Sequence, residues 1–283
     1  RYTNGNFTGI RIMGVFQNNL LAGAAAAASA GGGAFYDYQI EQSVRLDRAS
    51  SSYFSRAIQS GGSTRQWTLS FWFKLTASAG FGSNEYHVYT ADTNAQGSYD
   101  VFMFDQSSTS TNFWRIFQPT SSYKAENSFR DSSGWGHLML VADSPNSDQT
   151  LRRRMYFNGT LLSPQSANYP SQNADCSFNA NKTHLIGSRQ DISSSHFYDG
   201  YFAEWHFVDG YSYDASYFGE TKNGVWIPKD YYTTTGNYGT TGYYLKFENA
   251  SDLGNDSSGN NNDFSVTNMG ADHQVLDSPT FGS

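Results

Sequence analysis

The chain has 283 residues, of which 15% are charged, and its formal net charge is −7. Such an acidic chain lacks the basic surface that nucleic-acid-binding proteins use, so we expect no nucleic-acid partner. No stretch of about 20 apolar residues occurs, which excludes a membrane-spanning helix. The single cysteine, Cys176, excludes an internal disulfide bond and favours folding in a reducing cytoplasm.

Residues 1–40 differ in composition from the rest of the chain. They contain a five-alanine run and the triplet Gly31-Gly32-Gly33, and Leu20 to Ala30 imitates the apolar part of a signal peptide but is only weakly hydrophobic. An arm this short cannot bury its own apolar side chains in a core. It is either a flexible linker or an assembly element, and we predict assembly. The apolar side chains in question are Ile10, Ile12, Val15, Phe16, Leu20 and Leu21.

From residue 41 onward the pattern is strand, turn, strand. Trp67 to Leu75 alternates apolar and polar side chains, as a half-buried strand does. Asn158-Gly159 is a strong hairpin signal, and 21 Phe, 20 Tyr and 6 Trp suit pleated surfaces. Further strands are expected at 43–48, 53–57, 85–91, 99–105, 112–118, 136–143, 151–157, 183–187, 200–208 and 242–248. The expected core comprises Trp67, Phe71, Phe73, Trp135, Leu138, Leu140, Tyr156, Ile186, Trp205, Phe207, Leu245 and Phe247.

Three segments resemble, in order, the motifs of laminin-G-like jelly rolls. The first segment comprises Ser43 to Asp47, Ser52 to Arg56 and Trp67 to Lys74. The second comprises Trp135 to Val141 and Arg154 to Gly159. The third comprises His184 to Gly187 and Asp199 to Phe207. The resemblance implies an all-β, concanavalin A/laminin-G-like β-sandwich jelly roll over residues 41–283, with 1–40 as a non-globular N-terminal arm. Residues 210–283 would form a tail that wraps or closes the sandwich. The alternative for the tail is the start of a second domain.

The tail resembles a narrower group, the structural proteins of marine bacteriophages encoded near tail or capsid-fibre genes. The resemblance lies in Phe207 to Gly210, Phe218 to Glu220, Val225 to Lys229, Gly242 to Phe247 and Asp256 to Phe264. It implies a non-enzymatic structural virion protein, a capsid-surface, tail-fibre or decoration subunit assembled in the host cytoplasm. Residues 1–40 would contact other virion proteins and sister subunits, and analogy with fibre and decoration proteins implies a trimer. The alternatives are a carbohydrate-binding lectin that attaches to a host-surface glycan and a polysaccharide depolymerase.

Two groups of residues are candidate binding sites. Asp256, Ser258, Asn260 and Asp263 offer oxygen atoms at alternating spacing that suit Ca²⁺, although an Asn/Ser-rich turn explains the same pattern. No other cofactor is expected. Aromatic side chains of the tail could stack on a sugar if they are exposed. These are Trp226, Tyr231 and Tyr238, together with Tyr232 and Tyr243.

Catalytic arrangements are sparse. A glycosidase needs two carboxylates across a sugar, and the last long strand offers only Glu204, with His206 beside it and Asp209 in the turn. We expect Glu204 and His206 to be solvent-facing partners on a sheet. No Gly-x-Ser-x-Gly motif is present, and Cys176 is expected to be an inert buried thiol.

Overall fold

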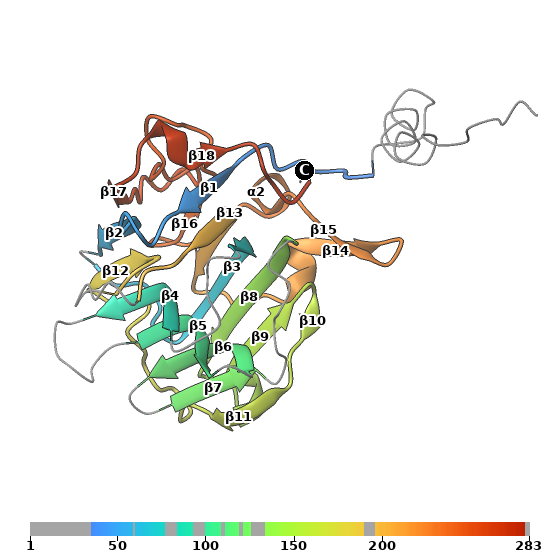
Figure 1. Cartoon of the computed structure of the whole chain (residues 1–283). Coiled ribbons are helices and arrows are strands. Elements are labelled where there is room, and N and C mark those ends of the chain that lie inside the picture. Colours follow the sequence, from blue (N-terminus) through green and yellow to red (C-terminus); the bar gives the residue numbers. More distant parts are fainter. Residues whose placement is uncertain are drawn as a thin grey trace, which may run out of the picture. The chain divides into compact units, whose positions relative to one another are not determined.

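A computed structural model describes residues 35–58, 60–76, 84–92, 100–108, 111–118, 121–125, 134–189 and 196–280. The chain divides into two units, Arg1–Asp37 and Tyr38–Ser283, and every element below belongs to the second (Figure 1). Nearly all of the expected N-terminal arm lies outside the described residues. The boundary falls slightly earlier than residue 40, because the Ile40 amide donates to Thr280 Oγ1 and the Ile40 side chain is buried.

Two antiparallel eight-stranded sheets form the jelly roll, which confirms the predicted all-β sandwich. The first, sheet A, has the order β10-β9-β8-β3-β13-β1-β18, with β16 also paired to β13. Its strands are β1 (Ser43–Leu46), β3 (Gln66–Leu75), β8 (Gly136–Asp143), β9 (Arg153–Phe157), β10 (Thr160–Leu161), β13 (Gly200–Asp209), β16 (Tyr243–Leu245) and β18 (Gln274–Val275).

The second, sheet B, has the order β11-β7-β6-β5-β4-β12-β2-β17. Its strands are β2 (Tyr53–Ala57), β4 (Asn84–Asp92), β5 (Asp100–Ser108), β6 (Thr111–Gln118), β7 (Ser121–Ala125), β11 (Pro164–Asn168), β12 (Thr183–Ile186) and β17 (Ser265–Thr267). A separate hairpin joins β14 (Gly219–Lys222) to β15 (Val225–Pro228). The described helices are short: η1 (Gln149–Leu151), η2 (Ala215–Tyr217), α2 (Tyr231–Thr234) and η3 (Ala271–His273).

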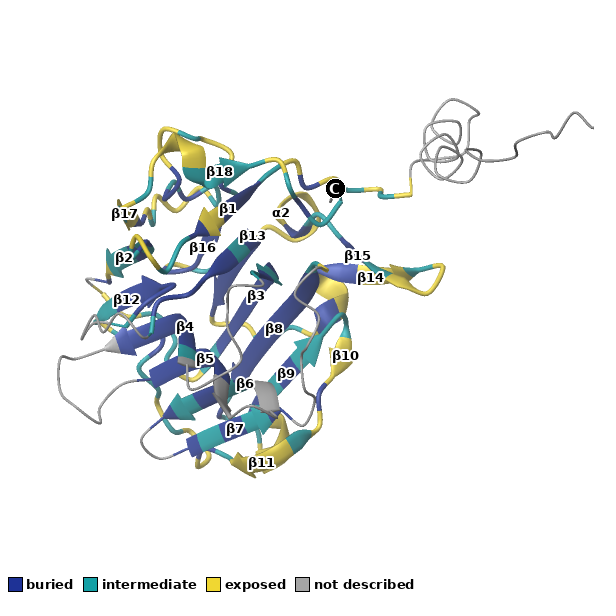
Figure 2. Cartoon of the chain, viewed as in Figure 1, coloured by how far each residue is buried: buried dark blue, intermediate teal, exposed yellow. Residues whose placement is uncertain are grey.

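The main core lies between the two sheets, and buried strands occupy the middle of each (Figure 2). Phe71 stacks on Trp205 with ring centroids 4.5 Å apart, and Trp67 stacks on Phe207 at 5.6 Å. Ten of the twelve expected core residues are buried. Trp135 and Tyr156 were expected in the core as well, but both are only partly buried, at the outer face of sheet A.

The outer face of sheet A is covered rather than half exposed. Thr68 and Ser70, the polar positions of the half-buried strand expected at 67–75, are fully buried. Thr68 Oγ1 donates to the Tyr211 carbonyl and accepts from the Tyr213 amide. A second apolar cluster forms there, because the tail places its aromatic rings against β8 and β13. It contains Met139, Val141, Val208, Ala215, Phe218, Tyr231, Tyr238 and Tyr244.

The end of the chain adds strands to the edges of both sheets. β17 pairs with β2 at the edge of sheet B, and β18 pairs with β1 at the edge of sheet A. The end of the chain therefore extends both sheets of the sandwich.

Candidate functional site

The site begins at an irregularity in β13. Phe202 and Trp205 both point into the core although they are three positions apart in the sequence, which a regular strand with alternating side chains does not allow. A β-bulge between Ala203 and His206 absorbs the odd spacing, and Glu204 adopts a positive φ of 49° there. The bulge places Glu204 and His206 together on the outer face of sheet A.

Glu204 and His206 form a buried polar network and are not solvent-facing as expected. The Glu204 carboxylate accepts hydrogen bonds from Tyr38 Oη at 3.0 Å and Tyr244 Oη at 2.5 Å. His206 Nε2 lies 3.4 Å from Glu204 Oε2, and Nδ1 lies 2.9 Å from Tyr238 Oη. Burial, and then the Glu204 charge, raise the pKa of both Tyr38 and Tyr244. These phenols therefore stay protonated and donate to the carboxylate.

A pocket of about 420 Å³ opens above this network. Tyr38 and Tyr244 are shared between network and pocket, so the buried carboxylate lies directly behind the pocket wall. Tyr232, on α2, is 47% exposed, and its ring centroid lies 6.2 Å from that of Tyr244. The complete lining is Tyr38, Asp230, Tyr232, Thr233, Tyr244, Lys246, Glu248, Asn255 and Ser257. We call it the Tyr232 pocket.

Local structure holds the pocket walls in place. Asp230 caps α2 by accepting from the Thr233 amide at 3.0 Å and from Thr233 Oγ1 at 2.6 Å. Lys246 and Glu248, just after β16, form an ion pair at 2.7 Å. The carboxylates of Asp230, Glu248 and the buried Glu204 outnumber the single ammonium group, that of Lys246. The pocket is therefore acidic and disfavours anionic ligands. Carboxylates, an amide, hydroxyls and one exposed ring suit a ligand rich in neutral hydroxyl groups.

Of the aromatic residues expected to stack on a sugar, only Tyr232 has an exposed ring. Tyr231, Tyr238 and Tyr243 are buried, so the expectation that these rings are exposed is wrong. Trp226 is half-buried and stacks on His137, with ring centroids 5.9 Å apart. Tyr231 and Tyr238 belong to the cluster on the outer face of sheet A, with Trp226 packed against it, whereas Tyr243 belongs to the main core.

The expected calcium ligands form a tight turn. Asp256 Oδ1 accepts from the amides of Tyr244 and Ser258, and Oδ2 accepts from Ser258 Oγ and the Asn262 amide, all at 2.8–2.9 Å. A carboxylate can accept about four hydrogen bonds, and groups of the protein itself donate four to Asp256. Asp263 accepts from the Asp256 amide, and the Asn260 side chain donates to the Gly239 and Gly242 carbonyls. The geometry therefore favours the Asn/Ser-rich turn.

The contacts of Asp209 and Cys176 indicate structural roles for both residues. Asp209 Oδ1 accepts from the Ser63 amide and from Asn179 Nδ2, and Oδ2 accepts from the amides of Thr240 and Thr241. Asp209 thus joins the start of β3 to the tail. Burial raises the pKa of Cys176 to about 11, so its thiol stays protonated and is a poor nucleophile.

The described residues contain one group of three side chains arranged like metal ligands, Glu85, His87 and His196. This group lies on sheet B and was not anticipated from the sequence. The pattern Glu-x-His on one strand was visible at 85–87, but its third member is more than a hundred residues away.

A sandwich of two antiparallel sheets with this strand order defines a lectin-type jelly roll. The model of the concanavalin A-like lectin/glucanases superfamily matches residues 48–211, more than half of the chain, and the protein belongs to that family. The family name covers both binding proteins and hydrolases, so membership alone does not distinguish between the two. A comparison with curated proteins gave no match. Among the described residues, no helix is long and apolar enough to cross a membrane.

Solved structures share the fold at low sequence identity. A protein from Bacteroides ovatus assigned to carbohydrate binding is 12% identical with a TM-score of 0.50, and the alignment covers 82% of this chain and 61% of that one. The heptameric SAP-like pentraxin of Limulus polyphemus is 15% identical (TM-score 0.43; 62% and 79% covered). Domains LG4-5 of the mouse laminin α1 chain are 11% identical (TM-score 0.39; 62% and 44% covered). The chain therefore spans less than two thirds of two of these three proteins.

Proposed function

We propose that this protein is a virion surface component, of capsid or tail, whose lectin-like jelly roll binds a neutral glycan of the host surface in the Tyr232 pocket. The glycan-binding part of this proposal rests on one observation. An exposed aromatic ring stands beside carboxylate, amide and hydroxyl groups in a pocket of about 420 Å³, which is within the usual size range of small-ligand sites. An aromatic face packs against the C–H face of a sugar, while the polar groups select its hydroxyls.

Hydrogen bonds also pre-position part of the pocket wall. Tyr38, Tyr244 and Glu204 hydrogen-bond to one another, so two of the phenols that line the pocket are fixed before a ligand arrives. Pre-organised side chains lose less conformational entropy on binding, which favours affinity for a small ligand. The acidic charge predicts neutral sugars rather than sialic or uronic acids, because like charges repel.

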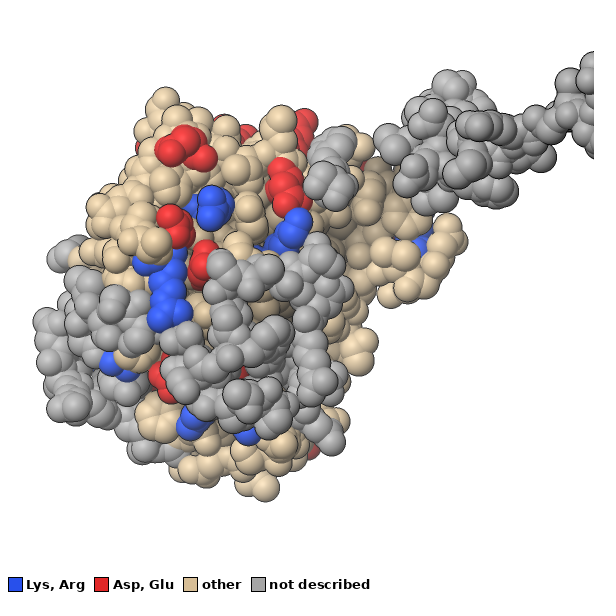
Figure 3. Space-filling model, viewed as in Figure 1, with Lys and Arg blue, Asp and Glu red and all other residues tan. Residues whose placement is uncertain are grey.

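The virion part rests on the sequence. The series from Phe207 to Phe264 resembles bacteriophage structural proteins, and the surface is poor in charge. Among the described residues visible on one face, Figure 3 shows acidic and basic side chains scattered, without a large basic area. Binding to other virion proteins, and trimer formation through residues 1–40, belong to the same proposal.

A glycan array with the full chain tests the glycan part. We expect binding to neutral glycans, and Tyr232→Ala should weaken it about tenfold or more by removing the stacking face. Tyr211→Ala is the matched control, because Tyr211 is similarly exposed, at 41%, and does not line the pocket. Equal binding by both variants, or binding to acidic glycans alone, would contradict the assignment. Shortening of the bound polysaccharide during incubation would instead indicate a depolymerase.

A further inference from the structure

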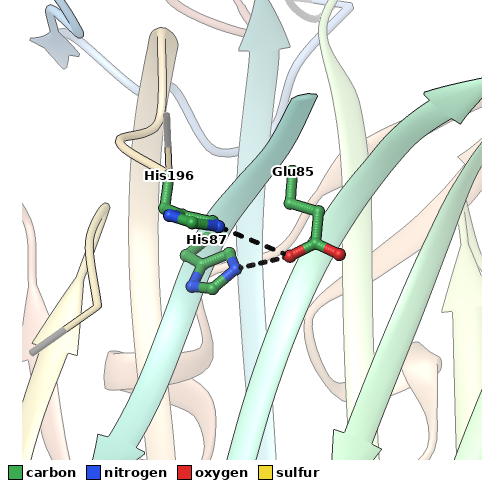
Figure 4. A group of neighbouring side chains, drawn as sticks. All are labelled: Glu85, His87 and His196. Carbon is green, nitrogen blue, oxygen red and sulfur yellow. Dashed lines mark hydrogen bonds and ion pairs between the residues drawn. The ribbon is translucent and has the colours of Figure 1, made fainter. Parts of the chain in front are cut away.

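A second group of functional side chains lies on sheet B, away from the Tyr232 pocket. Glu85 and His87 are two residues apart on β4, so their side chains leave the same face of the strand. Tyr86 between them points into the core. His196 lies on the segment that leads into β13, and its side chain points toward the same carboxylate (Figure 4). The His87 amide donates to the His196 carbonyl at 3.0 Å, which fastens this segment over β4.

The three side chains converge on a common point. Glu85 Oε2 lies 3.3 Å from His87 Nε2 and 3.7 Å from His196 Nε2. One ligand atom from each residue lies within 4.8 Å of the other two. Zinc with bonds of about 2.0–2.1 Å holds tetrahedral ligand atoms about 3.4 Å apart. Small side-chain movements would therefore bring all three atoms into one coordination sphere.

The three side chains differ in burial. His87 is buried, whereas Glu85 and His196 are partly exposed. Arg115 lies near Glu85, but its guanidinium is 3.5 Å from Asp105, which offsets its positive charge.

We propose that Glu85, His87 and His196 bind a divalent transition-metal ion, with Zn²⁺ as the best fit. Two imidazoles and one carboxylate are donors that zinc and related ions prefer, whereas Ca²⁺ prefers oxygen atoms only. Three protein ligands leave a fourth position for water or another ligand. The ion would join β4 of sheet B to the segment before β13 of sheet A, and it would stabilise the sandwich by linking residues distant in the sequence.

Metal titration of the full chain, without a polyhistidine tag and after treatment with chelator, tests this site. We expect calorimetry to show one Zn²⁺ per chain and a higher melting temperature, because an ion bound only by the native state stabilises it. Co²⁺ in the same site should give the visible absorption of a tetrahedral ion, and excess Ca²⁺ should not displace it.

Two variants and one control assign the ligands. Glu85→Gln and His196→Gln change partly exposed side chains, which the fold should tolerate, and each should weaken Zn²⁺ binding by at least about 100-fold. His273→Gln changes a histidine paired with Asp272 in the tail and should bind Zn²⁺ like the unaltered chain. Absence of Zn²⁺ uptake, or uptake with unaltered affinity in both site variants, would overturn the proposal. Glycan binding in the Tyr232 pocket is a separate measurement and does not depend on this outcome.

Discussion

The side chain of Asp209 shows how one residue attaches the tail to the jelly roll. Its carboxylate is buried and accepts four hydrogen bonds, from the amides of Ser63, Thr240 and Thr241 and from the Asn179 side chain. Asp209→Ala should lower the free energy of unfolding by about 3 kcal/mol or more, because it leaves buried donors without an acceptor. Denaturant unfolding measures the change, with the exposed Asp252→Ala as control. Equal stability of the two variants would show that these bonds contribute little.

Two buried histidines make stability depend on pH. Burial lowers the pKa of His137 and of His184 to about 3. His184 is held neutral, with Nε2 accepting from the Asn179 amide and Nδ1 beside the Lys182 carbonyl. The unfolded chain binds a proton at each histidine near pH 6.5, whereas the folded chain does not, so this contribution is complete above pH 6.5 and decreases as the pH falls toward 3.

Each of these histidines should reduce stability by up to about 1.4 kcal/mol per pH unit over that range. Unfolding curves from pH 7 to pH 4 measure the slope. His184→Gln should make the slope shallower by about one proton, even if it lowers stability at pH 7. A slope unaltered by this substitution would mean that His184 is protonated in the folded protein.

Individual residues also show where prediction from sequence fails. Alternation along the strand predicted that Trp205 and Phe207 face the core, and they do. The same alternation could not reveal the bulge at Glu204, because a bulge changes the period without a distinctive residue. Sequence therefore placed Glu204 and His206 side by side but on a solvated face, whereas the tail buries them.

Among the elements, the hairpin between β9 and β10 is the most clearly encoded. Asn158 and Gly159 have φ values of 45° and 77°, as a two-residue hairpin turn requires. A Cβ atom on Gly159 would also lie 2.2 Å from Cζ3 of Trp226. The glycine thus serves two purposes, the turn and the close approach of the β14–β15 hairpin.

The chain contains a matched pair that separates these two effects. Gly224 has a φ of 82° but nothing within 4 Å of the position of an added Cβ. Gly224→Ala should lower stability by about 1–2 kcal/mol through backbone strain alone. Gly159→Ala should lower it further, because Trp226 must move, and thermal unfolding of both variants measures the difference. Equal losses would show that the Trp226 contact is easily displaced.

The predicted strands include every strand of eight to ten residues, and these long strands form the centre of both sheets. β7, β11, β14, β15, β17 and β18 were not predicted. They are edge or hairpin strands of two to five residues, with little periodicity for a sequence pattern to reveal. Their pairing depends on the sheets already being in place, so the information lies in tertiary contacts.

In the molecule as a whole, the central strands β3, β8 and β13 of sheet A are buried on both faces, by sheet B on one side and by the tail on the other. The Tyr232 pocket lies within this second layer, at the junction of α2, β16 and the turn after β16. Aromatic composition predicted a sandwich. The composition could not predict which aromatic rings of the tail would be buried against sheet A. The exposed Tyr232 could therefore not be distinguished from its buried neighbours in the sequence.

The role of residues 1–40 is a prediction about assembly. Deletion should stop after Asp37, because Tyr38 and Ile40 contact Glu204 and Thr280 within the jelly roll. We expect light scattering to give a folded monomer for this shortened chain and an oligomer, a trimer by analogy with fibres, for the full chain. If both are monomers and the shortened chain still joins virions, the arm is only a tether.

Binding of a neutral sugar in the Tyr232 pocket can be seen in a crystal structure of the full chain with the best glycan from the array. We expect a sugar ring against Tyr232, with its hydroxyls hydrogen-bonded to Asp230, Glu248 or Asn255. A sugar bound with full occupancy elsewhere on the jelly roll, and none in this pocket, would contradict it.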